Sequence, residues 1–340
     1  MSKTIDSSDI SVVIQGAIDK VEISKCLNGI RNYLPNAESI LSTWEGSDIA
    51  GLDYDVLVLN EDPGFYPMDS RPNSKENNVN RQIQTVLCGL HAATREYAFK
   101  LRSDFVLNGS GFLNYFNLFL MSDPNYKIFE RKLLSCVFFA RNPRYFRPKL
   151  FHPSDIAFFG LRSDLINLFD VPHMIKKESG YYEANGYYNC RYTPEQHIWI
   201  NCLRKNCHKI DFDNQLDINE KNIEDTERYA VSNFIFLDWK QFNLVAPRRL
   251  RAFANNDFHD SITHIEWLRL YKQYLENTLV VPNKDPMRDL INRRTKKFEW
   301  CRAISKICTM FFIGKRLQNF RKNARKCMLS YLAKNIILPK

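Results

Sequence analysis

The sequence predicts an α/β fold in which a mostly parallel sheet is flanked by helices. Three observations favour this class. Short β-branched or aromatic runs alternate with segments of helical spacing over the first 240 residues, as in βαβ units. Polar or charged residues follow directly after several of these runs, where an open α/β sheet binds its ligands. A chain of 340 residues with 44% hydrophobic content is also long enough to bury a full core.

The first strand is predicted at residues 10–14, whose sequence ISVVI is typical of a fully buried strand. Gln15 and Gly16 follow it directly. A glycine at a sharp turn leaves room for a ligand to approach the backbone. We therefore expect Gln15 and Gly16 to contact a ligand. A helical pattern begins near Ser24 and stops at Pro35.

Two further strands are predicted at residues 39–44 and 55–59. The first is followed by Glu45 and Gly46, and the other by the polar turn of residues 60–64. Strand, helix, strand, loop and strand in this order indicate parallel strands joined by crossovers.

The helix predicted at residues 77–91 has a polar first turn that includes Asn78 and Arg81. Backbone N–H groups and the macrodipole at a helix N-terminus favour an anion. These two side chains are therefore candidates for binding a charged ligand. An exposed, solvated first turn explains the same residues equally well.

The central strand is predicted within residues 96–107, EYAFKLRSDFVL. Its apolar run extends to Leu101 and is followed by Arg102, Ser103 and Asp104. A carboxylate at the carboxyl end of a strand can hold Mg²⁺ or Mn²⁺ against a diphosphate, because these cations prefer oxygen ligands. A lone aspartate in this position more often has a structural role.

In the second half of the chain, strands are predicted at residues 132–140, 156–160 and 231–237. His152 and Asp155 come just before the second of these strands. We expect His152 to be a second metal ligand and Asp155 to contact a substrate.

A helix is predicted to begin with Thr193 as N-cap and Pro194 as its first residue. Glu195 lies in its first turn, where the helix dipole favours the ionised carboxylate, so it is a candidate general base. A purely stabilising glutamate is equally common at this position.

The positive charge of the chain is concentrated in its tail. The formal net charge is +10, and residues 293–340 contain 14 Lys and Arg against Glu299 alone, so the tail carries +13 and the rest −3. Two amphipathic helices with basic polar faces are predicted there, as in helices that lie in a membrane interface. Packing against the domain or another subunit would also explain the apolar stripes. We expect three regions: residues 1–240, the helical extension 241–292 and the membrane-associating tail 293–340.

Composition excludes several other classes of protein. The nearly neutral body does not favour a nucleic-acid partner. The nine cysteines form no C-x-x-C pair, which indicates free thiols in a reducing compartment rather than a zinc site. The N-terminal sequence lacks the apolar core of a signal peptide, and no apolar run approaches the length of a membrane span. We therefore expect a cytoplasmic protein.

Six short blocks together resemble the WavE family of lipopolysaccharide biosynthesis proteins. The similarity lies in their order and spacing between about residues 10 and 237. The blocks are ISVVIQG at 10–16, LSTWEG at 41–46, NNVNRQ at 77–82, KLRSD at 100–104, FHPSD at 151–155 and TPEQ at 193–196.

The resemblance implies a bacterial glycosyltransferase with a GT-A-like, Rossmann-type domain. Such an enzyme would move a sugar from a nucleotide-sugar donor to a lipid-linked or lipopolysaccharide acceptor (core, O-antigen or capsule), working peripherally at the cytoplasmic face of the inner membrane. GT-A enzymes bind a divalent cation and the donor diphosphate through an Asp-x-Asp at a strand end. Here the matching residues are Arg102, Ser103 and Asp104, so the first aspartate is missing. Either Asp104 alone anchors Mn²⁺ or Mg²⁺, or Arg102 takes over part of the charge neutralisation.

The expected donor site comprises strand ends and the polar helix start: Gln15, Gly16, Glu45, Asn78, Arg81, Arg102, Ser103 and Asp104. The acceptor is expected beside His152, Asp155 and Glu195, with Glu195 or Asp155 as the base if the reaction inverts. Two alternatives remain. A sugar-phosphate nucleotidyltransferase would need a glycine-rich, basic phosphate loop, which Gln15-Gly16-Ala17 is not. A non-catalytic peripheral membrane scaffold would depend on the tail alone.

Overall fold

The computed structural model describes residues 5–68, 76–145, 148–181, 190–247, 250 and 259–311. The chain divides into two compact units, one of Met1–Val245 with Asp260–Pro282 and one of Ala246–His259 with Asn283–Lys340. The predicted region boundaries after residues 240 and 292 stay predictions.

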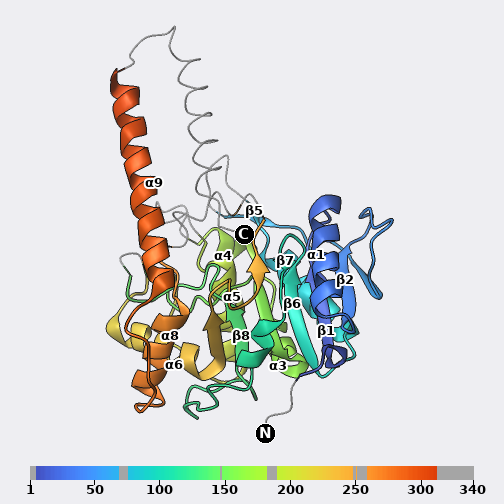
Figure 1. Ribbon diagram of the computed structural model, residues 1–340, viewed down its shortest axis with the longest axis horizontal. Coiled ribbons are helices and arrows are strands. Elements are labelled where there is room, and N and C mark those ends of the chain that lie inside the picture. Colours follow the sequence, from blue (N-terminus) through green and yellow to red (C-terminus); the bar gives the residue numbers. More distant parts are fainter. Residues whose placement is uncertain are drawn as a thin grey trace. The chain divides into compact units, whose positions relative to one another are not determined.

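A seven-stranded sheet forms the centre of the first unit, in the order β10-β8-β9-β6-β1-β2-β3 (Figure 1). Within this sheet only β9 runs antiparallel to its neighbours. The predicted α/β class with a mostly parallel sheet is confirmed. The strands of this sheet are β1 (Ile10–Gln15), β2 (Glu38–Trp44), β3 (Val56–Asn60), β6 (Tyr97–Arg102), β8 (Leu133–Cys136), β9 (Ala157–Leu161) and β10 (Phe234–Leu237).

Helices flank this sheet. The helices of the first unit are α1 (Lys20–Tyr33), α2 (Val79–Ala92), α3 (Arg162–Phe169), α4 (Lys176–Ser179), α5 (Pro194–Lys205), α6 (Glu220–Asn233) and α8 (His264–Tyr274), with short 3-10 turns η1 (Ser7–Asp9) and η2 (Gly111–Tyr115). Two small antiparallel sheets complete it, one of β4 (Tyr66–Pro67) with β5 (Glu76–Asn77) and one of β7 (Val106–Leu107) with β11 (Leu244–Val245).

The direction of the strand order reverses next to β1. From β1 the chain passes through α1 to β2 and then β3, whereas α2 returns it to β6 on the other side of β1. Because crossovers between parallel strands are right-handed, α1 and α2 lie on opposite faces of the sheet. The carboxyl ends of β1 and β6 therefore form a topological switch point, the place where open α/β sheets bind ligands.

Helix α2 packs very closely on the sheet because Gly89 has no side chain. A Cβ atom at Gly89 would lie 2.4 Å from Cγ1 of Val13 and 3.2 Å from Cβ of Ser42. This contact brings the first turn of α2 near the ends of β1 and β2.

The two faces of β6 have different chemistry, because successive side chains of a strand point to opposite faces. Phe99 is fully buried and its ring lies 5.2 Å from that of Phe112, which stacks at 5.2 Å on Phe242. On the other face, the equally buried Lys100 lies with Nζ 5.8 Å from the ring centroid of Phe169 in α3. A buried cation thus lies directly below the switch point.

Three predicted strands have different bounds in the structure. The strand predicted at residues 132–140 is shorter, since β8 covers only Leu133–Cys136 and a turn follows it. The run at residues 96–107 is divided, because β6 ends at Arg102 and β7 pairs with β11 in a separate small sheet. The strand predicted at residues 231–237 begins only at Phe234, since the preceding residues complete α6. The buried face of α6 includes the polar residues Asn222, Thr226 and Glu227 beside Tyr229 and Val231, so polar residues interrupt the apolar stripe by which helices are identified in sequence.

The second unit contains helix α9 (Pro286–Phe311). The first predicted tail helix falls on its C-terminal half, where Trp300 is 71% exposed. The second lies outside the described residues, as does all of 312–340. In the described part of the chain, no helix has the length and apolarity needed to cross a membrane.

Candidate functional site

The switch point is held together by contacts between the ends of β1 and β6. Gln15 is in register with Arg102, and the amide of Ser103 donates to the carbonyl oxygen of Gln15 at 3.1 Å. The Ser103 hydroxyl donates to the carbonyl oxygen of Ala17 at 3.0 Å. Gly16 has φ +121°, and a Cβ there would lie 3.3 Å from Ser103 Oγ. A glycine therefore permits both the backbone conformation and the close approach of the two strand ends.

Gln15 also links the sheet to helix α2. Its side chain is 6% exposed, and its Oε1 accepts a hydrogen bond from the hydroxyl of Thr85 at 3.2 Å. Gln15 therefore fixes the position of the strand end relative to the helix, in addition to any contact with a ligand.

Arg102 and Asp104 form a two-point ion pair at the end of β6. Nε of Arg102 lies 3.1 Å from Oδ1 of Asp104, and Nη2 lies 2.8 Å from Oδ2. The guanidinium carbon is 5.6 Å from the ring centroid of Phe105. Burial lowers the pKa of Arg102, but Asp104 and Asp155 raise it more, so the net shift is upward. Arg102 is thus a permanent cation in a fixed orientation.

The antiparallel direction of β9 brings the segment before it to the same edge. Leu101 is in register with Ala157, so the residues preceding β9 lie beside the end of β6. Ser154 fixes this segment, since its hydroxyl donates to the carbonyl oxygen of Phe138 at 2.6 Å and accepts from the amide of Ile156 at 3.1 Å. His152 and Asp155 are therefore placed at the switch-point edge.

The first turn of α5 places Glu195 beside this segment. Thr193 is the N-cap, as predicted, and forms a capping box with Gln196. Nε2 of Gln196 also donates to the carbonyl oxygen of Leu150 at 2.8 Å. This bond ties the helix start to the segment that contains His152, and Nε2 of His152 lies 3.3 Å from Oε2 of Glu195.

Burial governs the protonation of this pair. It lowers the pKa of His152 well below its ordinary value, with Lys149 and Arg141 acting in the same direction. Burial raises the pKa of Glu195, against the opposing effect of Lys149 and Arg141. His152 is therefore neutral at neutral pH, and its Nε2 can carry the proton that faces an ionised Glu195. Nδ1 of His152 is buried without a hydrogen-bond partner among the described residues.

Asp155 is held by its backbone. The contacts come from Lys100, which was not predicted as a site residue, and from Gln82 of the polar first turn of α2. Nζ of Lys100 donates to the carbonyl oxygens of Asp155 and Ile156, and Nε2 of Gln82 donates to that of Asp155 at 3.1 Å. Burial lowers the pKa of Lys100 to about 7. Burial also raises the pKa of Asp155, and the charge of Glu195 raises it further. The two carboxylates therefore belong to one electrostatically coupled cluster.

The three remaining candidate donor contacts are Glu45, Asn78 and Arg81. Glu45 has an exposed side chain beyond the end of β2. Arg81 binds Asp62 with Nη2 2.6 Å from Oδ2, and its Nη1 lies 2.8 Å from Oδ1 of Asn78. Its guanidinium also lies 5.0 Å from the ring centroid of Phe65. Among the described residues, no hydrogen bond or ion pair joins Glu45, Asn78 or Arg81 to Asp104 or Glu195.

The residues expected to bind a divalent cation do not form a ligand set. Both oxygens of Asp104 accept from Arg102, and His152 faces Glu195 instead of Asp104. In the described parts of the chain, no group of three or more His, Cys, Asp and Glu side chains is arranged to hold a metal ion. The arrangement does not fit the oxygen-rich site that Mg²⁺ or Mn²⁺ prefers. The cation requirement stays a prediction.

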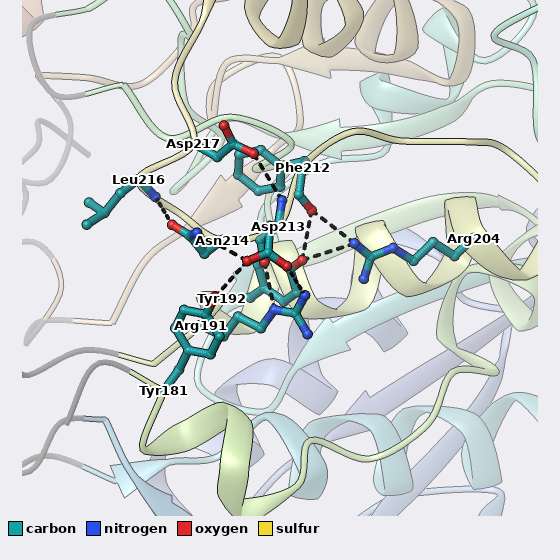
Figure 2. A network of polar contacts seen from close by, with 9 residues as sticks. All are labelled: Tyr181, Arg191, Tyr192, Arg204, Phe212, Asp213, Asn214, Leu216 and Asp217. Atoms are coloured by element: carbon teal, nitrogen blue, oxygen red, sulfur yellow. Dashed lines mark hydrogen bonds and ion pairs between the residues drawn. The ribbon is translucent and has the colours of Figure 1, made fainter. Parts of the chain in front are cut away.

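A separate polar network supports the chain before and after α5 (Figure 2). Asp213 accepts from the Tyr181 hydroxyl at 2.6 Å and pairs with Arg191. Arg204 of α5 donates to the Tyr192 hydroxyl at 3.1 Å, and its guanidinium lies 5.8 Å from that ring. Arg191 and Tyr192 directly precede the capping residue Thr193, so this network holds the approach to the helix that carries Glu195.

The fold and this edge define a doubly wound α/β protein with a cluster of charged side chains at the topological switch point, where this class of fold binds ligands. The chain belongs to the WavE lipopolysaccharide synthesis family, whose model matches residues 10–300. The family membership expected from the sequence is confirmed, and it associates the chain with lipopolysaccharide synthesis. Among curated proteins, none matches the chain.

Proposed function

We propose that the protein is a glycosyltransferase that moves a sugar from a nucleotide-sugar donor to a lipid-linked or lipopolysaccharide acceptor. One observation carries this proposal. A fixed cation, Arg102, and a coupled carboxylate pair, Asp155 and Glu195, lie at the same edge of a doubly wound sheet. Glycosyl transfer requires this combination, because the leaving group is anionic and the attacking hydroxyl must lose a proton.

In this proposal, the donor binds where β1 and β6 end. Gly16 leaves the backbone open to the nucleotide, and Arg102 faces the diphosphate. Ser103 and Gln15 keep the two strand ends together through their contacts with Ala17 and with Thr85. The crevice outside the strand ends is the general ligand position in this class of fold.

The acceptor binds on the side of β9 and α5, and Glu195 is the general base. An acceptor hydroxyl attacks the anomeric carbon, the bond from that carbon to the diphosphate oxygen breaks, and the hydroxyl proton moves to Glu195. The nucleoside diphosphate leaves with the electron pair. A raised pKa makes Glu195 a stronger base than an exposed carboxylate, and His152 orients it from 3.3 Å. Asp155 supports the same chemistry as the second, coupled carboxylate.

We place this reaction at the cytoplasmic face of the inner membrane, with residues 293–340 on the lipid surface. The support is the excess of basic residues in that segment, 14 against one acidic residue, and the exposed Trp300. Basic residues near anionic head groups contribute about 1 kcal/mol each. Sedimentation with anionic vesicles tests this part: the full chain binds and a chain ending at residue 292 does not, whereas equal binding of both would refute it.

The activity is tested by incubating the full chain with a panel of nucleotide sugars and lipopolysaccharide acceptors. Release of nucleoside diphosphate together with a mass increase of the acceptor supports glycosyl transfer. Release of pyrophosphate from a nucleoside triphosphate and a sugar phosphate would replace the proposal with nucleotidyl transfer. A chain that binds vesicles but neither binds nor turns over any nucleotide sugar would be a scaffold.

A further inference from the structure

We propose that Arg102, oriented by Asp104, neutralises the donor diphosphate in the place where a pair of acidic residues would hold a divalent cation. The binding of the diphosphate then requires no metal. This inference rests on the proposed glycosyl transfer and specifies how its donor is recognised.

One edge of the Arg102 guanidinium pairs with Asp104, and the other edge is available to a ligand. Its Nε and Nη2 face the carboxylate of Asp104, whereas Nη1 has no hydrogen-bond partner among the described residues. The side chain of Arg102 is 24% exposed, so it is neither sealed in the core nor fully solvated. An arginine held on one edge by a carboxylate presents its remaining N–H groups in a fixed direction, which suits a phosphate group.

The face of the guanidinium is restrained as well. Phe105 lies 5.6 Å from the guanidinium carbon and is itself fully buried. Edge and face contacts together reduce the side-chain entropy that a flexible arginine would lose on binding an anion. Asp104 is therefore a positioning residue in this proposal, acting through Arg102.

The same ion pair opposes a cation at Asp104. A divalent ion bound to either carboxylate oxygen would lie within a few ångström of the guanidinium, and like charges at that distance repel strongly in a partly buried site. The ion would also have to displace Nε or Nη2 from the oxygen that it binds. No neighbouring His, Cys, Asp or Glu side chains in the described residues complete a ligand set around Asp104.

The surroundings of the pair supply further positive charge. Lys100 and Arg102 act on the charge of Asp155, and Lys149 and Arg141 act on that of Glu195. Among the described residues, the carboxylates that act most strongly on Lys100 are Asp155, Asp104 and Glu195. A diphosphate entering from the strand ends therefore meets compensating charge from the chain itself, which is the role that a cation has in metal-dependent donor sites.

The test uses nucleoside diphosphates as probes of the full chain. Each of UDP, GDP, CDP, ADP and dTDP is titrated by calorimetry, once in EDTA and once in Mn²⁺. For the nucleotide that binds, we expect dissociation constants in the two buffers to agree within about twofold. Arg102→Gln should raise the dissociation constant at least about tenfold in both buffers, because it removes a charge-assisted contact. Asp104→Asn should raise it less, about threefold, since it loosens the guanidinium without removing it.

Arg31→Gln is the matched control. Arg31 also forms a two-point pair with an aspartate, Asp55, with Nη1 3.0 Å from Oδ2 and Nη2 2.9 Å from Oδ1. Asp55 precedes β3, so this pair lies at the opposite edge of the sheet. We expect wild-type affinity from this variant. Thermal unfolding of each variant separates a lost contact from a lost fold, and Arg102→Lys should recover part of the affinity by restoring the charge.

Two results would overturn the inference. In the first, binding requires Mn²⁺, is abolished by Asp104→Asn and is retained by Arg102→Gln. This result would identify Asp104 as a metal ligand and leave glycosyl transfer standing. Failure of every nucleoside diphosphate to bind in both buffers would remove the proposed function and this inference with it.

Discussion

Nε2 of His152 lies 3.3 Å from Oε2 of Glu195, and both side chains are almost completely buried, at 3% and 12% exposure. The histidine comes from the segment before β9 and the glutamate from the first turn of α5. Burial shifts their pKa values in opposite directions, downward for His152 and upward for Glu195. Burial therefore disfavours a doubly charged pair, so the contact is a hydrogen bond from neutral His152 to Glu195 rather than an ion pair.

Replacing Glu195 with glutamine should remove the general base and preserve the shape of the site. We expect turnover to fall about 10²- to 10⁴-fold while nucleotide affinity stays within about twofold of wild type, because the proposed donor contacts lie on β1 and β6. Steady-state kinetics and calorimetry give the two quantities. Glu22→Gln is the control, since Glu22 is also a first-turn glutamate, in α1, and pairs with Lys25. Full activity of the Glu195 variant would eliminate this residue as the base.

Replacing His152 with phenylalanine should shift the pH dependence of kcat. The loss of a merely structural residue would lower kcat without shifting its pH dependence. A neutral histidine that donates from Nε2 stabilises ionised Glu195, so its loss raises the pKa of that carboxyl further. The acid limb of the kcat profile should then move upward by about one pH unit, which corresponds to about 1.4 kcal/mol. His152→Gln, which retains a donor, should move it less. A lower but unshifted profile for the phenylalanine variant would contradict the assignment.

A second buried lysine, Lys132, should make the stability of the protein depend on pH. Its ammonium donates to the carbonyl oxygens of Met121 and Ser232, and burial lowers its pKa from 10.5 to about 7. Between these two values the unfolded chain binds the proton and the folded chain does not. The free energy of unfolding therefore rises with pH through this window, by up to about 1.4 kcal/mol per pH unit for this group.

Lys132→Met should reduce that slope in urea unfolding measured between pH 7 and pH 9. The slope should not vanish, because Lys100 has its pKa lowered to about 7 by the same cause and contributes with the same sign. Lys25→Met, at a side chain with 54% exposure, should keep the wild-type slope. An unchanged slope in Lys132→Met would mean that its ammonium is already charged in the folded protein at pH 9.

The contact between α2 and the sheet should tolerate no side chain at Gly89. A Cβ atom there would lie 2.4 Å from Cγ1 of Val13, so Gly89→Ala should lower the free energy of unfolding by roughly 1–3 kcal/mol. The double variant Gly89→Ala with Val13→Ala removes the clashing methyl group. It should be less destabilised than the sum of the two single variants, and additive effects would show that the helix shifts away from the sheet instead.

Much of the sheet could be predicted from the sequence because most buried runs stop at a polar residue. The exception is β8, which ends at Cys136 before the apolar residues Val137 and Phe138. Thr193 and Pro194 likewise identified the start of α5 by local chemistry alone. The antiparallel direction of β9 could not be predicted in this way, since the direction of a strand depends on its partners in space. That direction explains why His152 and Asp155 lie beside the end of β6.

The individual contacts of the site were harder to predict. Arg102 ends β6, and Ser103 and Asp104 lie in the turn that follows it. The ion pair between Arg102 and Asp104 therefore depends on the geometry of this turn, which the alternation of side chains along a strand does not predict. Lys100 stands within an apolar run of the sequence. Nothing in the neighbouring residues indicates that its ammonium donates hydrogen bonds to two backbone carbonyl oxygens. The ion pair between Arg81 and Asp62 could not be predicted either, because Asp62 lies in a turn 19 residues earlier.

The antiparallel direction of β9 also separates the segments of the candidate site that can vary in length from the strands that cannot. The proposed donor side is built from β1 and β6, which are paired in register along six residue pairs. The proposed acceptor side is supplied by the loop before β9 and by the approach to α5, neither of which lies within the sheet register. Relatives could therefore lengthen or shorten these two segments, and so exchange one acceptor for another, while the strand ends continue to receive the same kind of donor.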